Sequence, residues 1–298
     1  MNYLPIEYIE PVFRPPSEAR SLILQVSNGC SYNRCTFCEM YTAPQKKFKP
    51  KAITEIEKEL KAVASKAPDM SRFFLADGDA MTLSFRRLKA ILVCINRYFP
   101  GRERVTSYCL PRNIKKKTIE ELAELKELGL SMVYVGCESG DDQVLECVQK
   151  GETFETSKDA LLKLKAAGIK SSVMILNGLG GLKFSEQHAI NTAKLVNEAQ
   201  PEFVSTLVVS FPVGEERFRA GFNGEYEPLE QSDLFQEIRT FIAKLELTNT
   251  VFRSDHASNY LVLKGELGTD KQAMLDKIDL ALNKPGAIPL RQEWQRGL

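Results

Sequence analysis

The amino-acid sequence predicts an α/β fold, a partial (β/α)6 TIM-type barrel of parallel strands with a C-terminal α-rich extension. Short apolar runs of strand length alternate with amphipathic segments of helical length between residues 21 and 212. These apolar runs are almost continuous, which is typical of parallel strands buried beneath helices. A doubly wound open sheet shows the same alternation and is the alternative.

Six apolar runs are the predicted strands, and the segments between them are the predicted helices. The strands are residues 21–26, 72–76, 104–108, 131–135, 170–176 and 203–209. The helices are residues 54–63, 85–99, 118–128, 143–149, 156–167 and 185–199. Thr54 and Glu57 have the spacing of a capping box, and Gly129 ends the third helix. Right-handed crossovers between parallel strands curl such a series into a full or partial barrel.

The alternation stops after residue 212. Residues 213–229 are rich in Gly, Glu and aromatic side chains, which indicates a loop or lid. Two helical segments, residues 232–245 and 270–283, flank a polar stretch without clear period at residues 251–260. We therefore divide the chain into an N-terminal arm (1–20), a barrel (21–212) and a C-terminal extension that closes the barrel (213–298).

Composition and charge indicate a globular enzyme. The chain has 298 residues, with 43% hydrophobic and 27% charged residues. Lys and Arg number 40 against 39 Asp and Glu, so no strong electrostatic footprint for nucleic acid or an anionic membrane is expected. The N-terminus lacks a cationic, apolar signal sequence, and no apolar run is long enough to span a bilayer. The expected compartment is the reducing cytoplasm.

Three cysteines lie within nine residues of the loop that follows the first strand. Cys30, Cys35 and Cys38 have C-x4-C-x2-C spacing, which suits an iron–sulfur cluster. Three ligands would leave one iron of a four-iron cluster open to a substrate or cofactor. A structural zinc site would need a distant fourth ligand, because His188 and His256 each lack a neighbouring Cys or His. An odd total of seven cysteines disfavours a disulfide framework.

Polar residues follow the predicted strands at their carboxyl ends, where parallel α/β folds place functional side chains. Asp77, Gly78 and Asp79 follow the second strand, Arg112 and Asn113 the third, Glu138 the fourth, and Asn177 and Gly178 the fifth. Strand alternation places Glu138 on the opposite face from Cys137. Ordinary alternatives remain for each: a turn at Asp77–Asp79, an acid near a helix start at Glu138, and a glycine turn at Asn177.

The cysteine loop, with Phe37 directly before its last cysteine, resembles that of the radical S-adenosylmethionine (SAM) superfamily. That superfamily usually has three residues between the first two cysteines, and this chain has four. Residues 15–41, 136–140, 177–181 and 256–260 resemble a branch related to oxygen-independent coproporphyrinogen oxidases and the Elongator catalytic subunit.

The resemblance implies a radical SAM enzyme with one 4Fe-4S cluster held by Cys30, Cys35 and Cys38. The open iron would chelate SAM, and one electron from a donor such as flavodoxin or ferredoxin would release a 5′-deoxyadenosyl radical. That radical would act on an unidentified small-molecule or cofactor-like substrate. Membrane and nucleic-acid partners are not expected.

The resemblance also implies which residues contact the cofactor. Asp77, Gly78 and Asp79 occupy the element that contacts the methionyl ammonium, although Asp77 replaces its first glycine. Glu138 would contact the ribose or amino group of SAM, Asn177 and Gly178 would lie at the adenine edge, and Phe37 would belong to the cofactor site.

Arg112, His256 and Asn259 are the candidate catalytic residues. Arg112 could hold a carboxylate, and the polar stretch around His256 and Asn259 could contact substrate or cofactor; a surface charge and packing side chains are the alternatives. His188 is expected to be structural, and Cys94, Cys109, Cys137 and Cys147 to be small apolar side chains. A non-catalytic iron–sulfur electron carrier or redox sensor, or an RNA-modifying radical SAM enzyme, remain alternative functions.

Overall fold

The computed structural model describes residues 4–212, 214–284 and 286–296. The chain divides into two compact units. Unit 1 comprises Met1–Asn33, Cys38–Val135 and Leu162–Ser171. Unit 2 comprises Arg34–Phe37, Gly136–Leu161 and Ser172–Leu298. The boundaries predicted from the sequence stay predictions, and residue 213, where the extension was predicted to begin, lies outside the described residues.

Unit 1 is built on parallel strands. They pair in the order β1 (Leu22–Gln25), β4 (Arg72–Ala76), β5 (Arg104–Cys109) and β6 (Leu130–Glu138, whose last residues belong to unit 2). A separate antiparallel pair joins β2 (Ser27–Asn28) to β3 (Lys49–Pro50). Because the four main strands are parallel, the residues that follow β1, β4 and β5 emerge at one edge of the unit.

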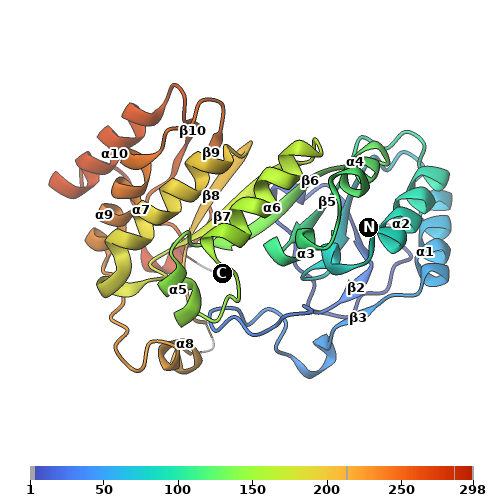
Figure 1. Cartoon of the computed structure of the whole chain (residues 1–298), viewed down its shortest axis with the longest axis horizontal. Coiled ribbons are helices and arrows are strands. Elements are labelled where there is room, and N and C mark those ends of the chain that lie inside the picture. The colour runs from blue at the N-terminus through green and yellow to red at the C-terminus, as the bar shows by residue number, and fades with distance from the viewer. Residues whose placement is uncertain (1–3, 213, 285, 297–298) are drawn as a thin grey trace. The chain divides into compact units, whose positions relative to one another are not determined.

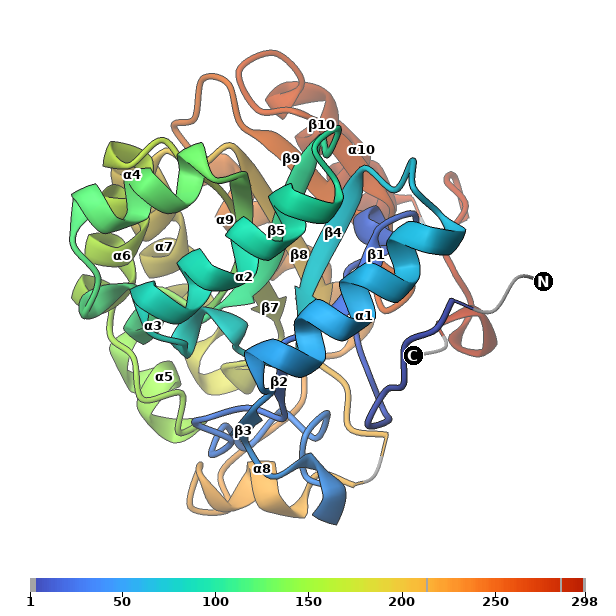
Figure 2. The ribbon, with the colours of Figure 1, turned by 90° about the vertical axis from the view of Figure 1, so that its right-hand side faces the viewer.

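Three amphipathic helices cover the strands of unit 1. They are α1 (Ile53–Lys66), α2 (Phe85–Tyr98) and α4 (Ile119–Glu127), and Figure 2 shows α1 and α2 beside β1, β4 and β5. The N-cap of α1 is Ala52 and makes no side-chain bond, so the capping box predicted at Thr54 and Glu57 is wrong. Thr118 does cap α4, because its hydroxyl accepts from the Glu121 N–H. Sequence reasoning missed the short α3 (Pro111–Lys115), which begins with a proline.

The strands of unit 2 pair in the order β7 (Lys170–Asn177), β8 (Phe203–Val208), β9 (Val251–Ser254) and β10 (Leu263–Glu266). The first three are parallel, and β10 is antiparallel to β9. The first two residues of β7 belong to unit 1. Strand β9 lies inside the stretch where we expected no regular period. The C-terminal segment therefore adds two short strands to the helices that were predicted there.

The helices of unit 2 are α5 (Asp142–Cys147), α6 (Phe154–Ala166, ending in unit 1), α7 (Gly181–Ala199), α8 (Glu216–Ala220), α9 (Gln231–Lys244) and α10 (Lys271–Asn283). Helix α9 packs between α7 and α10, as Figure 1 shows. Its buried residues include Leu234, Ile238 and Ile242. The described residues also form four short 3-10 helices: η1 (Pro16–Glu18), η2 (Pro44–Lys46), η3 (Ala80–Thr82) and η4 (Glu293–Gln295).

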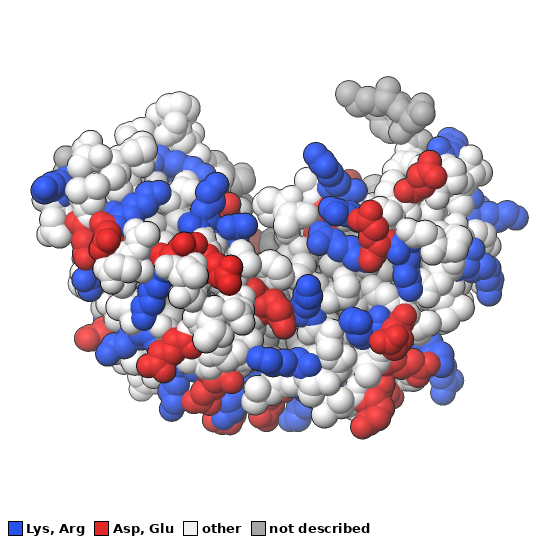
Figure 3. Space-filling view, turned by 90° about the horizontal axis from the view of Figure 1, so that it is seen from above, with Lys and Arg blue, Asp and Glu red and all other residues white. Residues whose placement is uncertain are grey.

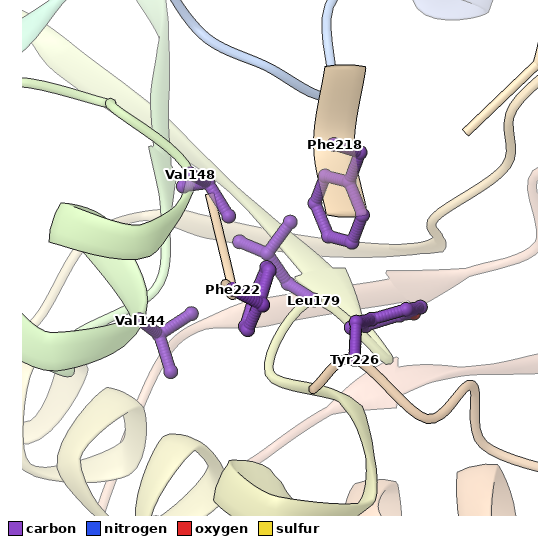
Figure 4. Packing of buried hydrophobic residues seen from close by; sticks show 6 residues of the cluster. All are labelled: Val144, Val148, Leu179, Phe218, Phe222 and Tyr226. Carbon is purple, nitrogen blue, oxygen red and sulfur yellow. The ribbon is translucent and has the colours of Figure 1, made fainter. Parts of the chain in front are cut away.

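The segment predicted as a loop or lid folds around an aromatic cluster in unit 2. Phe218, Phe222 and Tyr226 are buried together with Val144, Val148 and Leu179 (Figure 4). The ring centres of Phe218 and Tyr226 lie 4.8 Å apart with the rings nearly perpendicular. Such edge-to-face packing adds to the stability gained by burying the rings. We call these six residues the aromatic cluster.

Candidate active site

The three loop cysteines are available as thiols, because none of the seven cysteines is in a disulfide. Cys35 is buried, and Cys30 and Cys38 are half-buried. Burial, reinforced by the nearby Asp79, raises the pKa of Cys30 to about 11. In the part of the chain that the structure describes, no three Cys, His, Asp or Glu side chains are arranged as metal ligands. Because the thiolate is the form that binds metal, metal binding must displace a proton from Cys30.

In unit 1, Asp77 and Asp79 hold the beginning of the cysteine loop. The Gly29 N–H donates to Oδ2 of Asp77 at 3.3 Å, and the Ser31 N–H donates to Oδ1 of Asp79 at 3.0 Å. The Ser31 hydroxyl also donates to Asp79. Burial raises the pKa of Asp79, although the bonds from Ser31 oppose this shift. The acids after β4 thus lie directly beside Cys30 along the loop.

Gly78 permits this close approach because it has no side chain. A Cβ atom at this position would lie 2.7 Å from Cε2 of Tyr41 and 3.0 Å from Cβ of Cys30. Any other residue would push the cysteine loop away from the end of β4. Glycine at this position is explained by steric contact with the loop, and the role of Gly78 in cofactor binding stays a prediction.

Asp77 has a partner that sequence reasoning missed. Lys46, at the far end of the cysteine loop, forms an ion pair with Asp77, and both side chains are fully buried. A lysine among several exposed lysines gives no sequence signal of such burial.

Arg112 also contacts the cysteine loop. Its guanidinium lies 3.7 Å from the centre of the Tyr32 ring, in a cation–π contact. Asn113 is used locally, because its side-chain oxygen accepts from the Leu110 N–H at 2.6 Å. Of the two residues after β5, Arg112 is the one that reaches the loop.

In unit 2, residues 34–37 of the same loop are anchored to the helix α5 region. The Thr36 N–H donates to the Val148 carbonyl at 3.0 Å. Phe37 packs against the aromatic cluster, and the ammonium of Lys150 lies 5.6 Å from the centre of its ring. Phe37 therefore ties the loop to a packed core.

Glu138, at the end of β6, forms a buried ion pair with Lys150. Burial by itself lowers the pKa of Lys150, but the Glu138 carboxylate and the Cys35 thiol overcome this effect and raise it. Glu138 has a left-handed backbone with φ of 65°. A Cβ atom on Gly136 would lie 2.3 Å from Oε1 of Glu138, so glycine makes room for the carboxylate. Sequence reasoning missed Lys150.

The loop after β7 is held from both sides. The Gly178 N–H donates to Oε1 of Glu237 at 2.6 Å, and the Tyr226 hydroxyl donates to the Gly178 carbonyl at 3.1 Å. Gly178 has φ of 81°, which favours glycine. The Asn177 carbonyl accepts from the Val209 N–H at 2.9 Å. Burial raises the pKa of Glu237, a residue that the sequence did not single out.

His188 is buried, with its Nδ1 atom 2.8 Å from Oγ of Ser139 and its Nε2 atom 4.0 Å from Oε1 of Glu237. These contacts connect the residue after Glu138 to the acid that holds Gly178. Its surroundings match a structural histidine. Cys137 is fully buried and burial raises its pKa to about 12, but Glu138 is buried as well, so the predicted alternation along β6 stays a prediction.

His256 and Asn259 lie after β9, at the carboxyl end of β8. Nδ1 of His256 accepts from the Ser258 N–H at 3.1 Å, and burial lowers the pKa of this histidine. The Asn259 amide donates to the Thr206 carbonyl at 2.9 Å, and Arg291 donates to the His256 carbonyl. These bonds stitch the segment to β8 and the C-terminal region. Their catalytic role stays a prediction.

Parallel strands, a three-cysteine loop after the first strand and buried acids beside it are the features expected of an α/β iron–sulfur enzyme. The family model of the radical SAM superfamily matches residues 24–196, more than half of the chain. The chain belongs to this superfamily. It is therefore an enzyme that uses a 4Fe-4S cluster and SAM, as the resemblance implied.

Relatives agree with this membership. The chain is 26% identical over 144 residues to the heme chaperone HemW of Bacillus subtilis, covering 48% of this chain and 38% of HemW. It is 25% identical over 185 residues to the 4′-phospho-dehydrooxetanocin synthase of Priestia megaterium, covering 55% of this chain and 25% of that protein. The chain thus spans well under half the length of these curated relatives.

The fold is shared with a solved radical SAM enzyme. Coproporphyrinogen III oxidase (HemN) from Escherichia coli aligns with a TM-score of 0.56 over 75% of this chain and 52% of HemN, at 17% identity. This likeness confirms the predicted α/β fold with a partial barrel. Among the helices that the structure describes, none is long and apolar enough to cross a membrane.

The donor set fits the cluster. Three thiols within nine residues provide three ligands, and the loop that carries them is held by hydrogen bonds at both Gly29 and Thr36. The fourth iron would have no cysteine from this loop. The buried Asp79 carboxylate accepts a hydrogen bond from the Ser31 N–H, directly after the first cysteine.

Proposed function

We propose that this chain cleaves SAM reductively and directs the resulting 5′-deoxyadenosyl radical to a small-molecule or cofactor-like substrate. One observation supports the proposal: the buried Asp79 carboxylate is bonded to Ser31, beside the first of three cysteines that would leave one iron of a four-iron cluster without a protein ligand. A carboxylate in that position suits the ammonium group of an amino-acid cofactor. An electron-transfer cluster with four protein ligands binds no cofactor that would require this carboxylate.

The cysteine loop and the residues that follow β4 and β5 would bind the methionyl part of SAM. Cys30, Cys35 and Cys38 would hold the cluster, which supplies the electron that splits a carbon–sulfur bond of SAM. Asp79 would accept a hydrogen bond from the methionyl ammonium. Arg112, already stacked on Tyr32, would keep positive charge near the loop and orient a carboxylate.

The residues that follow β6 and β7 would bind the nucleoside part of SAM, and Phe37 would help to fix the loop. Glu138 would accept from a ribose hydroxyl, with Lys150 neutralising its charge. Gly178 would present a bare backbone to the adenine edge, held there by Glu237 and Tyr226. Phe37 would shield the cluster from water through its contact with the aromatic cluster.

The charge distribution favours a small substrate. Lys and Arg alternate with Asp and Glu over the face drawn in Figure 3, and the chain's net charge is +1. Nucleic-acid binders concentrate positive charge on one face. Because HemW is named a heme chaperone, hemin belongs among the first compounds to test, and a flavodoxin or ferredoxin is the expected electron donor.

The test is anaerobic reconstitution with iron and sulfide, followed by SAM and dithionite. We expect 5′-deoxyadenosine and methionine to form in equal amounts, first without substrate and then faster with a cell extract. Cys30→Ala protein is the control and should form neither. A stable cluster that never cleaves SAM would instead support an electron carrier or redox sensor. Stimulation by purified tRNA but not by metabolites would support RNA modification.

A further inference from the structure

We propose that Lys46 and Asp77 form a clasp that closes the base of the cysteine loop, so that Asp77 positions the loop and does not bind the cofactor. This inference concerns residues 29–46 and rests on the proposed function only where it invokes the cluster. Asp77 occupies a position where the superfamily pattern has glycine. In the structure, the aspartate that replaces this glycine forms an ion pair with Lys46.

The two charges are buried as a pair. Both side chains have no exposed area, and Lys46 also donates to the Ile9 carbonyl at 2.8 Å. Gln25 donates to the same Asp77 oxygen from its side-chain nitrogen at 3.2 Å. A buried ion pair of this kind is held by further hydrogen bonds, and removal of either partner leaves an uncompensated charge.

The pair lies where the two ends of the loop meet. Gly29, which begins the loop, donates its N–H to the Asp77 oxygen that also binds Lys46. Gly29 has φ of 66°, and a Cβ atom there would lie 1.9 Å from the Lys46 carbonyl oxygen. The backbone at residue 29 therefore touches the backbone at residue 46, with Asp77 bonded to both residues.

Asn28 closes the same base through uncharged bonds. Its side-chain nitrogen donates to the Gln45 carbonyl at 2.7 Å and to the Lys47 carbonyl at 3.0 Å. Within the loop, Asn33 donates to the Tyr41 carbonyl at 2.9 Å. Closing a loop at its base removes most of the conformations that would separate Cys30, Cys35 and Cys38.

Asp77 and Asp79 therefore have separable tasks. Asp77 forms a buried ion pair with Lys46, whereas Asp79 accepts from the Ser31 N–H and hydroxyl. Loss of the clasp should release iron without altering SAM affinity in the molecules that keep a cluster. Loss of the Asp79 charge should weaken SAM binding without releasing iron.

The experiment uses four variants. They are Asp77→Asn, Lys46→Met, the double variant that combines these two changes, and Asn28→Ala. Glu18→Gln is the matched control, because Glu18 is equally buried and paired with Arg104 but does not contact the loop. Metal-free protein is digested with trypsin, which can cut at the exposed Arg34 and Lys47. Reconstituted protein is given an iron chelator, and SAM affinity is titrated on the cluster-loaded fraction.

We expect the single clasp variants to lose iron and to be cut in the loop about tenfold faster than wild type or more. The double variant should lie between them and wild type, since it leaves no unpaired charge. Glu18→Gln should match wild type in both rates, and SAM affinity should stay within about threefold in all cluster-loaded variants. Asn28→Ala, which exposes no buried charge, should show the same direction of change even if Lys46→Met fails to fold.

Wild-type rates of cleavage and iron release in Asp77→Asn and Asn28→Ala would overturn the clasp. So would an Asp77→Asn protein that keeps its iron but loses SAM affinity, because that result assigns Asp77 to the cofactor. If wild-type protein binds no cluster, the proposed function fails. The trypsin comparison on metal-free protein then still decides whether the clasp exists.

Discussion

The ammonium nitrogen of Lys150 lies 3.0 Å from the Oε1 atom of Glu138, and both side chains are almost completely buried. The Cys35 thiol is close enough to raise the pKa of the same lysine. One cation therefore balances a candidate cofactor residue and a candidate cluster ligand. Cys35 would become a thiolate when iron binds, so Lys150 is well placed to stabilise the loaded site.

Lys150→Met should destabilise the metal-free protein by about 3–5 kcal/mol, because it leaves the Glu138 carboxylate buried without a counter-charge. Lys150→Met combined with Glu138→Gln should recover most of that loss. The measurement is urea unfolding followed by circular dichroism. Lys158→Met is the control, since its partners Glu155 and Glu198 are largely exposed, and should change stability by less than about 1 kcal/mol. Equal losses in the single and double variants would contradict an ion-pair role.

Alanine at Cys30, Cys35 or Cys38 should abolish the visible absorption and most of the iron of the reconstituted protein. Two thiolates cannot hold a four-iron cluster securely. The four cysteines outside the loop should tolerate alanine with unchanged iron content; these are Cys94, Cys109, Cys137 and Cys147. Iron analysis that finds one of these four essential, and a loop cysteine dispensable, would refute the ligand assignment.

Asp79→Asn should keep the cluster and weaken SAM binding. A charge-assisted hydrogen bond to an ammonium group contributes about 1.5–3 kcal/mol, or about 10- to 100-fold in affinity. Asp69→Asn, at an exposed carboxylate of unit 1, is the matched control and should titrate like wild type. Identical SAM titrations for Asp79→Asn and wild type would remove Asp79 from the cofactor site.

Phe218→Ala should lower the free energy of unfolding by about 3–5 kcal/mol, as expected for a large fully buried ring. Because Phe37 packs against the same cluster, the variant should also release iron faster than wild type. Leu182→Ala removes a side chain that is 52% exposed and should do neither. If Phe218→Ala is destabilised but holds iron as wild type does, the aromatic cluster does not support the cysteine loop.

Glu237→Gln should change how stability depends on pH. Burial raises the pKa of Glu237 in the folded state above its ordinary value of 4.5. The protonated form is therefore favoured by folding, and its contribution is complete below the unfolded pKa and lost as pH rises through the folded pKa. The wild type should become less stable relative to Glu237→Gln as pH increases above 4.5. Chemical unfolding at several pH values measures this difference, and a constant difference would show that Glu237 titrates normally.

Much of the fold could be predicted because it depends on local patterns. The apolar runs around Leu24, Leu75 and Val204 are buried strands, and Thr118 caps the helix that it was predicted to begin. Strands β9 and β10 have four residues each and alternate buried with exposed polar side chains, such as Arg253 and Lys264. Segments that short carry no reliable period, and they become strands by pairing with β8 and with each other.

The site was predictable only where chemistry is carried by spacing. Three cysteines in nine residues predict a cluster, and glycine beside acid at the end of a strand indicates a close approach. Lys46, Lys150 and Glu237 gave no such signal, because charged side chains are normally exposed. Each is buried by a partner that only the folded chain brings near, and the Lys46–Asp77 contact spans 31 positions.

The Lys46–Asp77 pair also constrains how this sequence can evolve. A chain that regained glycine at position 77 would leave the Lys46 ammonium buried without a counter-charge. A chain that lost Lys46 first would leave the Asp77 carboxylate buried without one. Single substitutions at either position pass through a disfavoured intermediate, so the two sites should covary among homologues. Homologues with aspartate at position 77 should carry a Lys or Arg near the end of the cysteine loop. Homologues with glycine at both positions 77 and 78 should not need a basic residue there.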